Sequence, residues 1–132
     1  AHTAGDTAVV FRGSNAVHLG DVYNNSGYPF IDADNGGNID GLISFCKETL
    51  NRIDKDTVVI PGHGPVSDYQ GLSEYIEMLS VIRDRIVTMI KAGQTLEQIM
   101  VAKPTVEYDD DMGDPNLLIN RSYVSLTHRS VN

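Results

Sequence analysis

A histidine flanked by glycine and proline follows a strongly apolar segment in the middle of the chain. Residues 57–60, Thr-Val-Val-Ile, have the β-branched composition of a buried strand. The next five residues, Pro-Gly-His-Gly-Pro, are expected to end that strand in a tight turn. Proline lacks an amide proton, and glycine adopts backbone conformations that other residues avoid. The sequence therefore predicts that His63 sits on a turn just beyond the end of a strand.

Two more strands are predicted near the start of the chain. Residues 7–12 and 16–19 are apolar runs on either side of the turn Gly-Ser-Asn at 13–15, which favours a hairpin. Residues 21–37 are rich in Asn, Gly, Asp and Pro and have no periodicity. Structureless segments of this length in a small domain are often functional, so we expect a loop there that serves a site.

Four helices follow from capping residues and hydrophobic periodicity. Asn38 caps the first of them, which carries an apolar stripe and ends before residues 54–56. The longest helix is predicted over residues 68–92, opened by a capping box of Ser67 and Gln70. A short helix opens with Thr95 and Gln98 and ends before Lys103-Pro104, and the last one runs from Pro115 to about Thr127.

The element order predicts a single layered α/β domain over residues 1–132, with a small sheet and helices on one face. A sheet of about three strands with only one covered face leaves the other face to be buried. We therefore expect a partner sheet, from a second copy of the chain or from another chain.

Composition excludes several classes of function. The chain has 10 basic and 18 acidic residues, a net charge of -8, which disfavours binding to nucleic acid. No apolar run approaches the roughly 20 residues that span a bilayer, and no signal peptide is visible, so a soluble protein of unknown compartment is expected. Cys46 lies within a predicted helix, where a small buried residue is a better interpretation than a nucleophile.

Three candidate metal ligands lie at three predicted strand ends: His2, Asp21 and His63. Zinc binds imidazole and carboxylate groups, and strand ends that meet at one edge of a sheet can bring such groups together. Plain alternatives remain open at this point. Asp21 could accept backbone hydrogen bonds at a strand end, His63 could be a turn residue bonded to the backbone, and His2 lies next to the terminus.

These motifs resemble the second half of the metallo-β-lactamase fold superfamily. The similarity rests on His2-Thr3, Gly20-Asp21 and the turn at 61–65, and extends through residues 28–32, 36–41 and 102–105, which look like one branch of uncharacterised metallo-hydrolases. The resemblance implies half of an αββα sandwich, completed by dimerisation. It also implies that His2 belongs to one metal, Asp21 bridges two metals, and His63 belongs to the second.

The sequence departs from that family in one respect that matters for activity. The run His-x-His-x-Asp-His, which supplies the first metal ligands of the superfamily, does not occur in it. Two or three ligands fall short of the four that zinc usually takes, so a zinc site in one chain is expected to be incomplete. We therefore do not expect efficient hydrolysis by this chain alone.

Three functions remain open. The first is a remnant of a zinc-dependent hydrolase that now forms a homodimer through the exposed sheet face. The second is a subunit or fragment of an active ester, thioester or lactam hydrolase that needs a complementary N-terminal half. The third is a non-catalytic module that binds a small ligand or a protein through the loop at residues 21–37.

Overall fold

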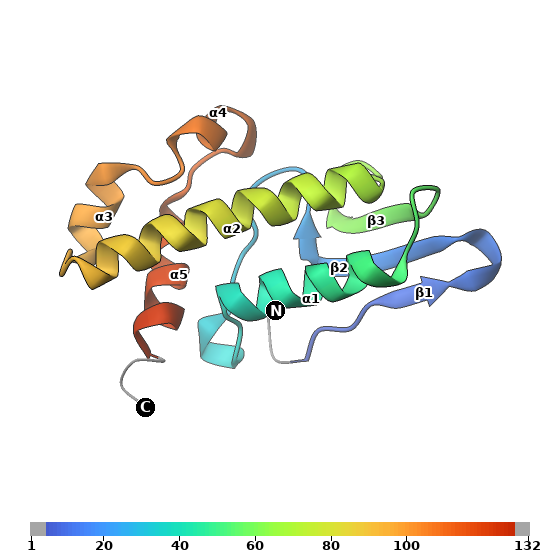
Figure 1. Ribbon diagram of the computed structural model, residues 1–132, viewed down its shortest axis with the longest axis horizontal. Helices are drawn as coiled ribbons and strands as arrows, with labels where there is room; N and C mark the ends of the chain where they lie inside the picture. Colours follow the sequence, from blue (N-terminus) through green and yellow to red (C-terminus); the bar gives the residue numbers. More distant parts are fainter. Residues whose placement is uncertain (1–4, 129–132) are drawn as a thin grey trace.

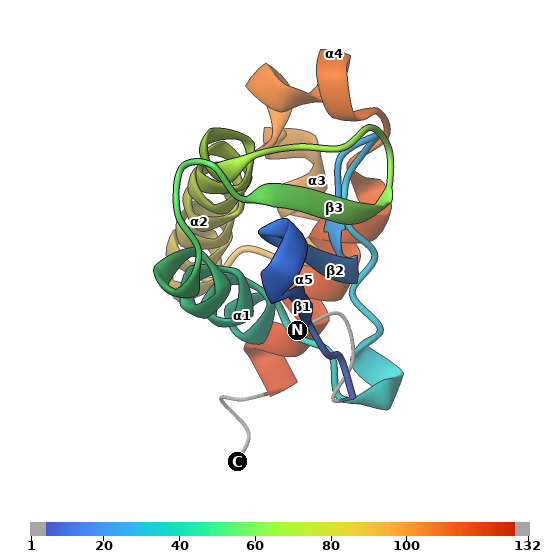
Figure 2. The same cartoon turned by 90° about the vertical axis from the view of Figure 1, so that its right-hand side faces the viewer.

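The computed structural model describes residues 5–128. They form two layers, a small sheet and a pair of long helices against one of its faces (Figures 1 and 2). The sheet contains β1 (Val9–Phe11), β2 (Ala16–Asn24) and β3 (Val58–His63), in the order β1-β2-β3. Strand β1 pairs antiparallel with β2, and β2 pairs parallel with β3. Parallel neighbours need a crossover connection, which α1 provides here.

The helices extend well beyond the sheet. Both α1 (Ile39–Arg52) and α2 (Tyr69–Lys91) run along the length of the molecule, as Figure 1 shows. The far end is built from α3 (Leu96–Ala102) and α5 (Asn116–His128), and α4 (Asp109–Met112) lies above α2. Short 3-10 turns complete the chain: η1 (Arg12–Ser14), η2 (Ala33–Asn35) and η3 (Val106–Tyr108).

Most helix boundaries agree with the sequence predictions. The Asn38 side chain accepts a hydrogen bond from the amide of Gly41 at 2.6 Å, so it caps α1 as expected. Thr95 and Gln98 form the predicted capping box of α3. Gly93 follows α2 with a φ of 81°, a left-handed conformation that glycine adopts without strain.

The predicted cap of the long helix is wrong. The N-cap of α2 is Asp68, whose carboxylate accepts a hydrogen bond from the amide of Gly71 at 2.8 Å. Ser67 instead pairs with Val59 of β3 in a short antiparallel bridge. Its hydroxyl also accepts a hydrogen bond from Tyr23 at 2.9 Å. Contacts with the sheet therefore draw Ser67 away from the helix and leave the capping position to the next residue.

Two strands are longer than the sequence suggested. Strand β2 continues through Asn24 instead of ending at residue 19, so the expected loop begins four residues after Asp21. Strand β3 continues through Pro61 and Gly62 to His63, although these residues were predicted to break it. The pairing of β2 with β3 is irregular on both sides of Gly20, which lets the ladder accommodate a proline.

Along β2 and β3, the two faces of the sheet differ in burial. Val17, Leu19 and Val59 are fully buried beneath the helices, in a core that also contains apolar residues of α1, α2, α3 and α5. The register places six residues together on the opposite side, which we call the outer face: Val9, Phe11, Ala16, His18, Val58 and Ile60. Val9 and Phe11 are each 48% exposed and Val58 is 41% exposed.

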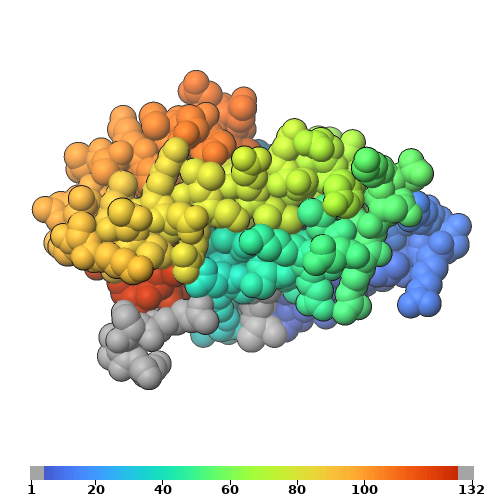
Figure 3. Space-filling view, viewed as in Figure 1, coloured from blue at the N-terminus to red at the C-terminus, as the bar shows by residue number. Residues whose placement is uncertain are grey.

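Figure 3 shows the helix side of the molecule, where side chains of α1, α2 and α3 form a continuous surface beside the projecting β1–β2 turn. Among the described residues, the two long helices α1 and α2 cover the other face, and in Figure 2 the outer face lies on the side of the sheet away from them. Across residues 5–128, no helix has the length and apolar character needed to cross a membrane.

Candidate metal centre

Two of the three predicted ligands meet where β2 and β3 lie side by side, since Asp21 is within β2, three residues before its end, and His63 is the last residue of β3. The Nε2 atom of His63 lies 3.0 Å from the Oδ1 atom of Asp21. Both side chains are open to solvent, with 64% of the His63 side chain and 54% of the Asp21 side chain exposed. An exposed imidazole beside an exposed carboxylate can form a charged pair when the histidine is protonated, or share a metal ion when it is neutral.

Glycines in both strands allow this approach. Gly20 has a φ of 58°, in the left-handed region, and this turns β2 just before Asp21. Gly62 precedes His63, and a methyl group there would lie 2.5 Å from the carbonyl carbon of Gly20 and 2.8 Å from Oδ1 of Asp21. Any larger residue at position 62 would therefore push the two strands apart at the point where the pair forms.

The segment after His63 is fixed by the loop that follows β2. The amide of Asn25 donates a hydrogen bond to the carbonyl oxygen of His63 at 2.8 Å, and its side chain donates to the carbonyl of Pro65 at 2.9 Å. Gly64 has a φ of 93°, and a methyl group there would lie 2.6 Å from the carbonyl carbon of Asn25. The backbone around His63 is thus held tightly even though its imidazole is exposed.

The Asp21–His63 pair matches zinc both in the type of ligand atoms and in the distance between them. Two ligands of a tetrahedral zinc ion, each about 2.0–2.1 Å from the metal, lie about 3.3 Å apart, close to the separation of these two atoms. The number of ligands does not suffice, however. Among the described residues, no group of three or more His, Cys, Asp or Glu side chains could hold a metal ion. His2, the third predicted ligand, lies outside the described residues.

Two further histidines occur among residues 5–128. His18 is on the outer face, and its Nδ1 atom accepts a hydrogen bond from the amide of Gly20 at 3.0 Å. That bond fixes the neutral ring with its proton on Nε2 and supports the turn before Asp21. His128 closes α5, and its side chain lies outside the described part of the chain.

Cys46 is fully buried in α1, as the sequence predicted. Burial raises the pKa of its thiol to about 12. A thiol with so high a pKa carries almost no thiolate at neutral pH, which makes it a poor nucleophile and a poor metal ligand.

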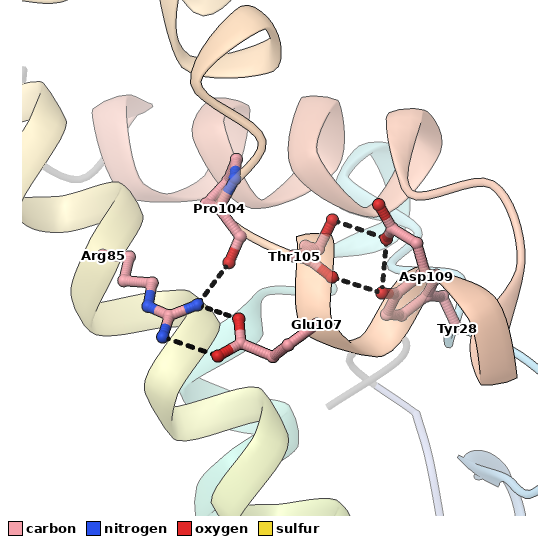
Figure 4. A network of polar contacts seen from close by, with 6 residues as sticks. All are labelled: Tyr28, Arg85, Pro104, Thr105, Glu107 and Asp109. Atoms are coloured by element: carbon pink, nitrogen blue, oxygen red, sulfur yellow. Dashed lines mark hydrogen bonds and ion pairs between the residues drawn. The ribbon is translucent and has the colours of Figure 1, made fainter.

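The first residue of the acidic run at 109–111 is held by two hydroxyl groups. Asp109 opens α4, and its Oδ1 atom accepts hydrogen bonds from the hydroxyl of Tyr28 at 2.7 Å and of Thr105 at 2.8 Å (Figure 4). The Tyr28 hydroxyl also lies 3.3 Å from the carbonyl oxygen of Thr105. Burial and the Asp109 hydrogen bond raise the pKa of Tyr28.

A second polar group in Figure 4 ties the same segment to α2. Arg85 donates hydrogen bonds to both carboxylate oxygens of Glu107 and to the carbonyl oxygen of Pro104. Sequence reasoning missed both sets of contacts, although residues 28–32 and 102–105 were each part of the family resemblance. Tyr28 is 77 and 81 residues from Thr105 and Asp109, and Arg85 is 19 and 22 residues from Pro104 and Glu107, so no local pattern could pair them.

Comparison with known proteins supports the fold. No protein-family model and no curated protein sequence matches the chain. Among solved structures, the chain is similar to the metallo-β-lactamase TMB-1, with a TM-score of 0.50 and 19% sequence identity. The match covers 60% of this chain and 36% of TMB-1, so it spans little more than a third of that protein. The chain thus has a small mixed α/β fold like part of a metallo-β-lactamase.

Proposed function

We propose that the chain is one half of a zinc-dependent hydrolase and that Asp21 and His63 are its share of the metal centre. The observation that carries this proposal is the 3.0 Å approach of the solvent-exposed His63 imidazole to the solvent-exposed Asp21 carboxylate on two neighbouring parallel strands. Two glycines support it: Gly62 makes room for that approach where a side chain would clash with Gly20 and Asp21, and Gly20 adopts the left-handed conformation that turns β2 before Asp21.

The described residues can perform only part of the chemistry. A zinc ion in such a centre would supply an activated water molecule and polarise an ester, thioester or lactam carbonyl. Asp21 would hold the metal through its carboxylate, and His63 through Nε2 on the next strand. His2 is proposed as a third ligand. With so few ligands of its own, the chain is proposed not to be catalytically competent alone.

The outer face supports the need for a second half. It gathers five apolar side chains and His18 on one side of a three-stranded sheet, and three of them are more than 40% exposed. Contiguous apolar surface of this kind is typical of an interface. A second apolar sheet lying against it would extend to the same edge as Asp21 and His63, and could contribute the ligands that this chain lacks.

Two sources of that second half are proposed, in order of preference. The first is another copy of the chain, which would form a homodimer and place two Asp21–His63 pairs near one axis. The second is a separate or upstream N-terminal half that carries the missing histidine-rich motif. Sedimentation at micromolar concentration separates them, because a dimer supports the first source and a stable monomer rejects it in favour of the second.

Zinc binding tests the metal proposal directly. Isothermal titration with Zn²⁺ after removal of metal by chelation should show weak binding by the wild-type chain. His63→Ala and Asp21→Asn should each reduce the affinity at least tenfold, since each removes one of few ligands. Asp110→Asn, at an exposed acidic residue, is the matched control and should bind as the wild type does. Equal binding by all four proteins would refute the proposal.

A binding-only function makes a different prediction. If the chain were a non-catalytic module that uses its loop, His63→Ala would leave ligand binding unchanged. Hydrolysis assays with an ester, a thioester and a β-lactam on the isolated chain should show no activity with added zinc. Activity that appears only after addition of the complementary half would support a split hydrolase.

A further inference from the structure

A small pocket lies beside the proposed metal centre, between α2, the end of β2 and α4. Its volume is about 290 Å³, which suits a small molecule or one end of a larger one. Tyr23 and Tyr75 form part of its wall, with ring centroids 4.7 Å apart, and Tyr108 forms another part. Met78 and Met112 complete the apolar surface.

Two of the tyrosines, Tyr23 at 1% and Tyr75 at 6% exposure, form the buried floor of the pocket, and their hydroxyls are bonded within the protein. The Tyr23 hydroxyl donates to Ser67 at 2.9 Å, and the Tyr75 hydroxyl donates to the carbonyl oxygen of Val22 at 3.0 Å. Burial raises the pKa of both phenols, so they stay neutral. Aromatic ring faces carry partial negative charge and attract cations.

The charged groups of the pocket share one sign. Glu74 and Asp111 line it, and among the described residues that line it none is basic. Glu74 accepts a hydrogen bond from the neutral amide of Gln70 at 3.2 Å, which leaves its negative charge uncompensated. A carboxylate or phosphate ligand would therefore be repelled, whereas a cation would be attracted by both the carboxylates and the rings.

We propose that this pocket binds an organic ammonium or amidinium group carried on a small apolar or aromatic body. The apolar part of the ligand would contact the tyrosine rings and the methionines, and its positive charge would pair with Glu74 and Asp111. Because Asn24 and Asn25 line the pocket and the Asn25 amide binds the His63 carbonyl, the bound molecule lies next to the edge that holds Asp21 and His63. The pocket would thus select a cationic substrate, a role that rests on the proposed hydrolase function.

The four methionines provide the readout. The protein is labelled with ¹³C-methyl methionine and titrated with benzylamine, in the presence of EDTA so that no metal contributes. The methyl signals of Met78 and Met112 should shift and saturate, with a Kd on the order of 1 mM for so small a probe. Met89 and Met100 do not line the pocket and are internal controls.

Charge selectivity is tested with two probes of similar shape. Benzyl alcohol is neutral and benzoate is an anion, and both should bind at least tenfold more weakly than benzylamine. Glu74→Gln and Asp111→Asn should each weaken benzylamine binding about tenfold, since each removes a charged partner. Glu77→Gln on the same helix and Asp110→Asn are matched controls at residues that do not line the pocket.

The results separate this proposal from the proposed metal function. Benzylamine shifts confined to Met78 and Met112 support the pocket whether or not zinc binds. Equal binding of benzoate, or shifts spread over all four methionines, would overturn it even if zinc binds as proposed. If benzylamine binds as described but the zinc affinity does not depend on Asp21 or His63, the proposed binding pocket stands. The proposed role of that pocket in selecting a substrate is then refuted.

Discussion

Gly62 and Gly20 lie against each other so closely that a methyl group at residue 62 would be 2.5 Å from the carbonyl carbon of Gly20. This contact between neighbouring strands sets the position from which Asp21 and His63 meet. The atoms that such a methyl group would meet belong to the Gly20 backbone, which cannot move away as the end of a flexible side chain could.

Gly62→Ala is therefore expected to destabilise the protein by about 1–3 kcal/mol, the usual cost of forcing extra volume into a packed region. Urea unfolding would measure the change, and the variant should also bind zinc more weakly. Gly13→Ala is the matched control, because a methyl group there meets no atom within 4 Å. Equal loss of stability in both variants would show that the Gly20–Gly62 contact has no special role.

Tyr28→Phe removes the donor of the hydrogen bond to Asp109 and leaves a half-buried carboxylate with Thr105 alone. We expect a loss of about 1.5–3 kcal/mol in the free energy of unfolding, typical of a hydrogen bond to a charged group. Chemical denaturation would measure it, with Tyr69→Phe as a control near the start of α2. A double-mutant cycle with Asp109→Asn should show coupling between the two positions, and additive effects would contradict the contact.

The Arg85–Glu107 pair predicts how stability depends on pH. Hydrogen bonding to Arg85 lowers the pKa of Glu107 in the folded protein below its ordinary value of 4.5. A carboxyl with a lowered folded pKa stabilises the protein fully above its ordinary pKa, and that contribution is lost as the pH falls through the folded value. The group is well exposed, so the effect is expected to be small.

The difference in Tm between wild type and Glu107→Gln should therefore be greatest near pH 6 and shrink as the pH falls toward 3. Thermal unfolding followed by circular dichroism at several pH values would measure it. Glu77→Gln, on the exposed side of α2, should show a smaller difference at pH 6. A constant difference across the range would mean that the ion pair does not contribute.

Cys46 should be unreactive in the native protein, because burial raises the pKa of its thiol to about 12 and removes it from solvent. Ellman's reagent at pH 8 should modify it only as fast as the structure opens, and at once in concentrated urea. Asp56→Cys, which adds a thiol at an exposed position, should react immediately without denaturant. Rapid native reaction of Cys46 would contradict its position in the core.

The parts of the fold that sequence predicted best are those with local causes. The apolar stripes of α1 and α2 follow helical periodicity, and the caps at Asn38 and Thr95 depend on residues three positions away. The cap at Ser67 was wrong because distant partners, Val59 and Tyr23, compete for that residue. Helix α4 was missed because its first residue is held by Tyr28 from the other end of the chain.

Local sequence was enough to single out Asp21 and His63, because each lies beside a glycine next to an apolar strand segment, in an order that resembles a family of metal-dependent hydrolases. Tertiary structure decided that Asp21 and His63 meet at 3.0 Å, because strand pairing across Gly20 and Gly62 is a long-range contact that no local pattern encodes. It also decided which face of the sheet stays open, since that depends on where the helices pack. Asp21, His63 and the open face lie on one small sheet, which is why we propose that a second half completes both.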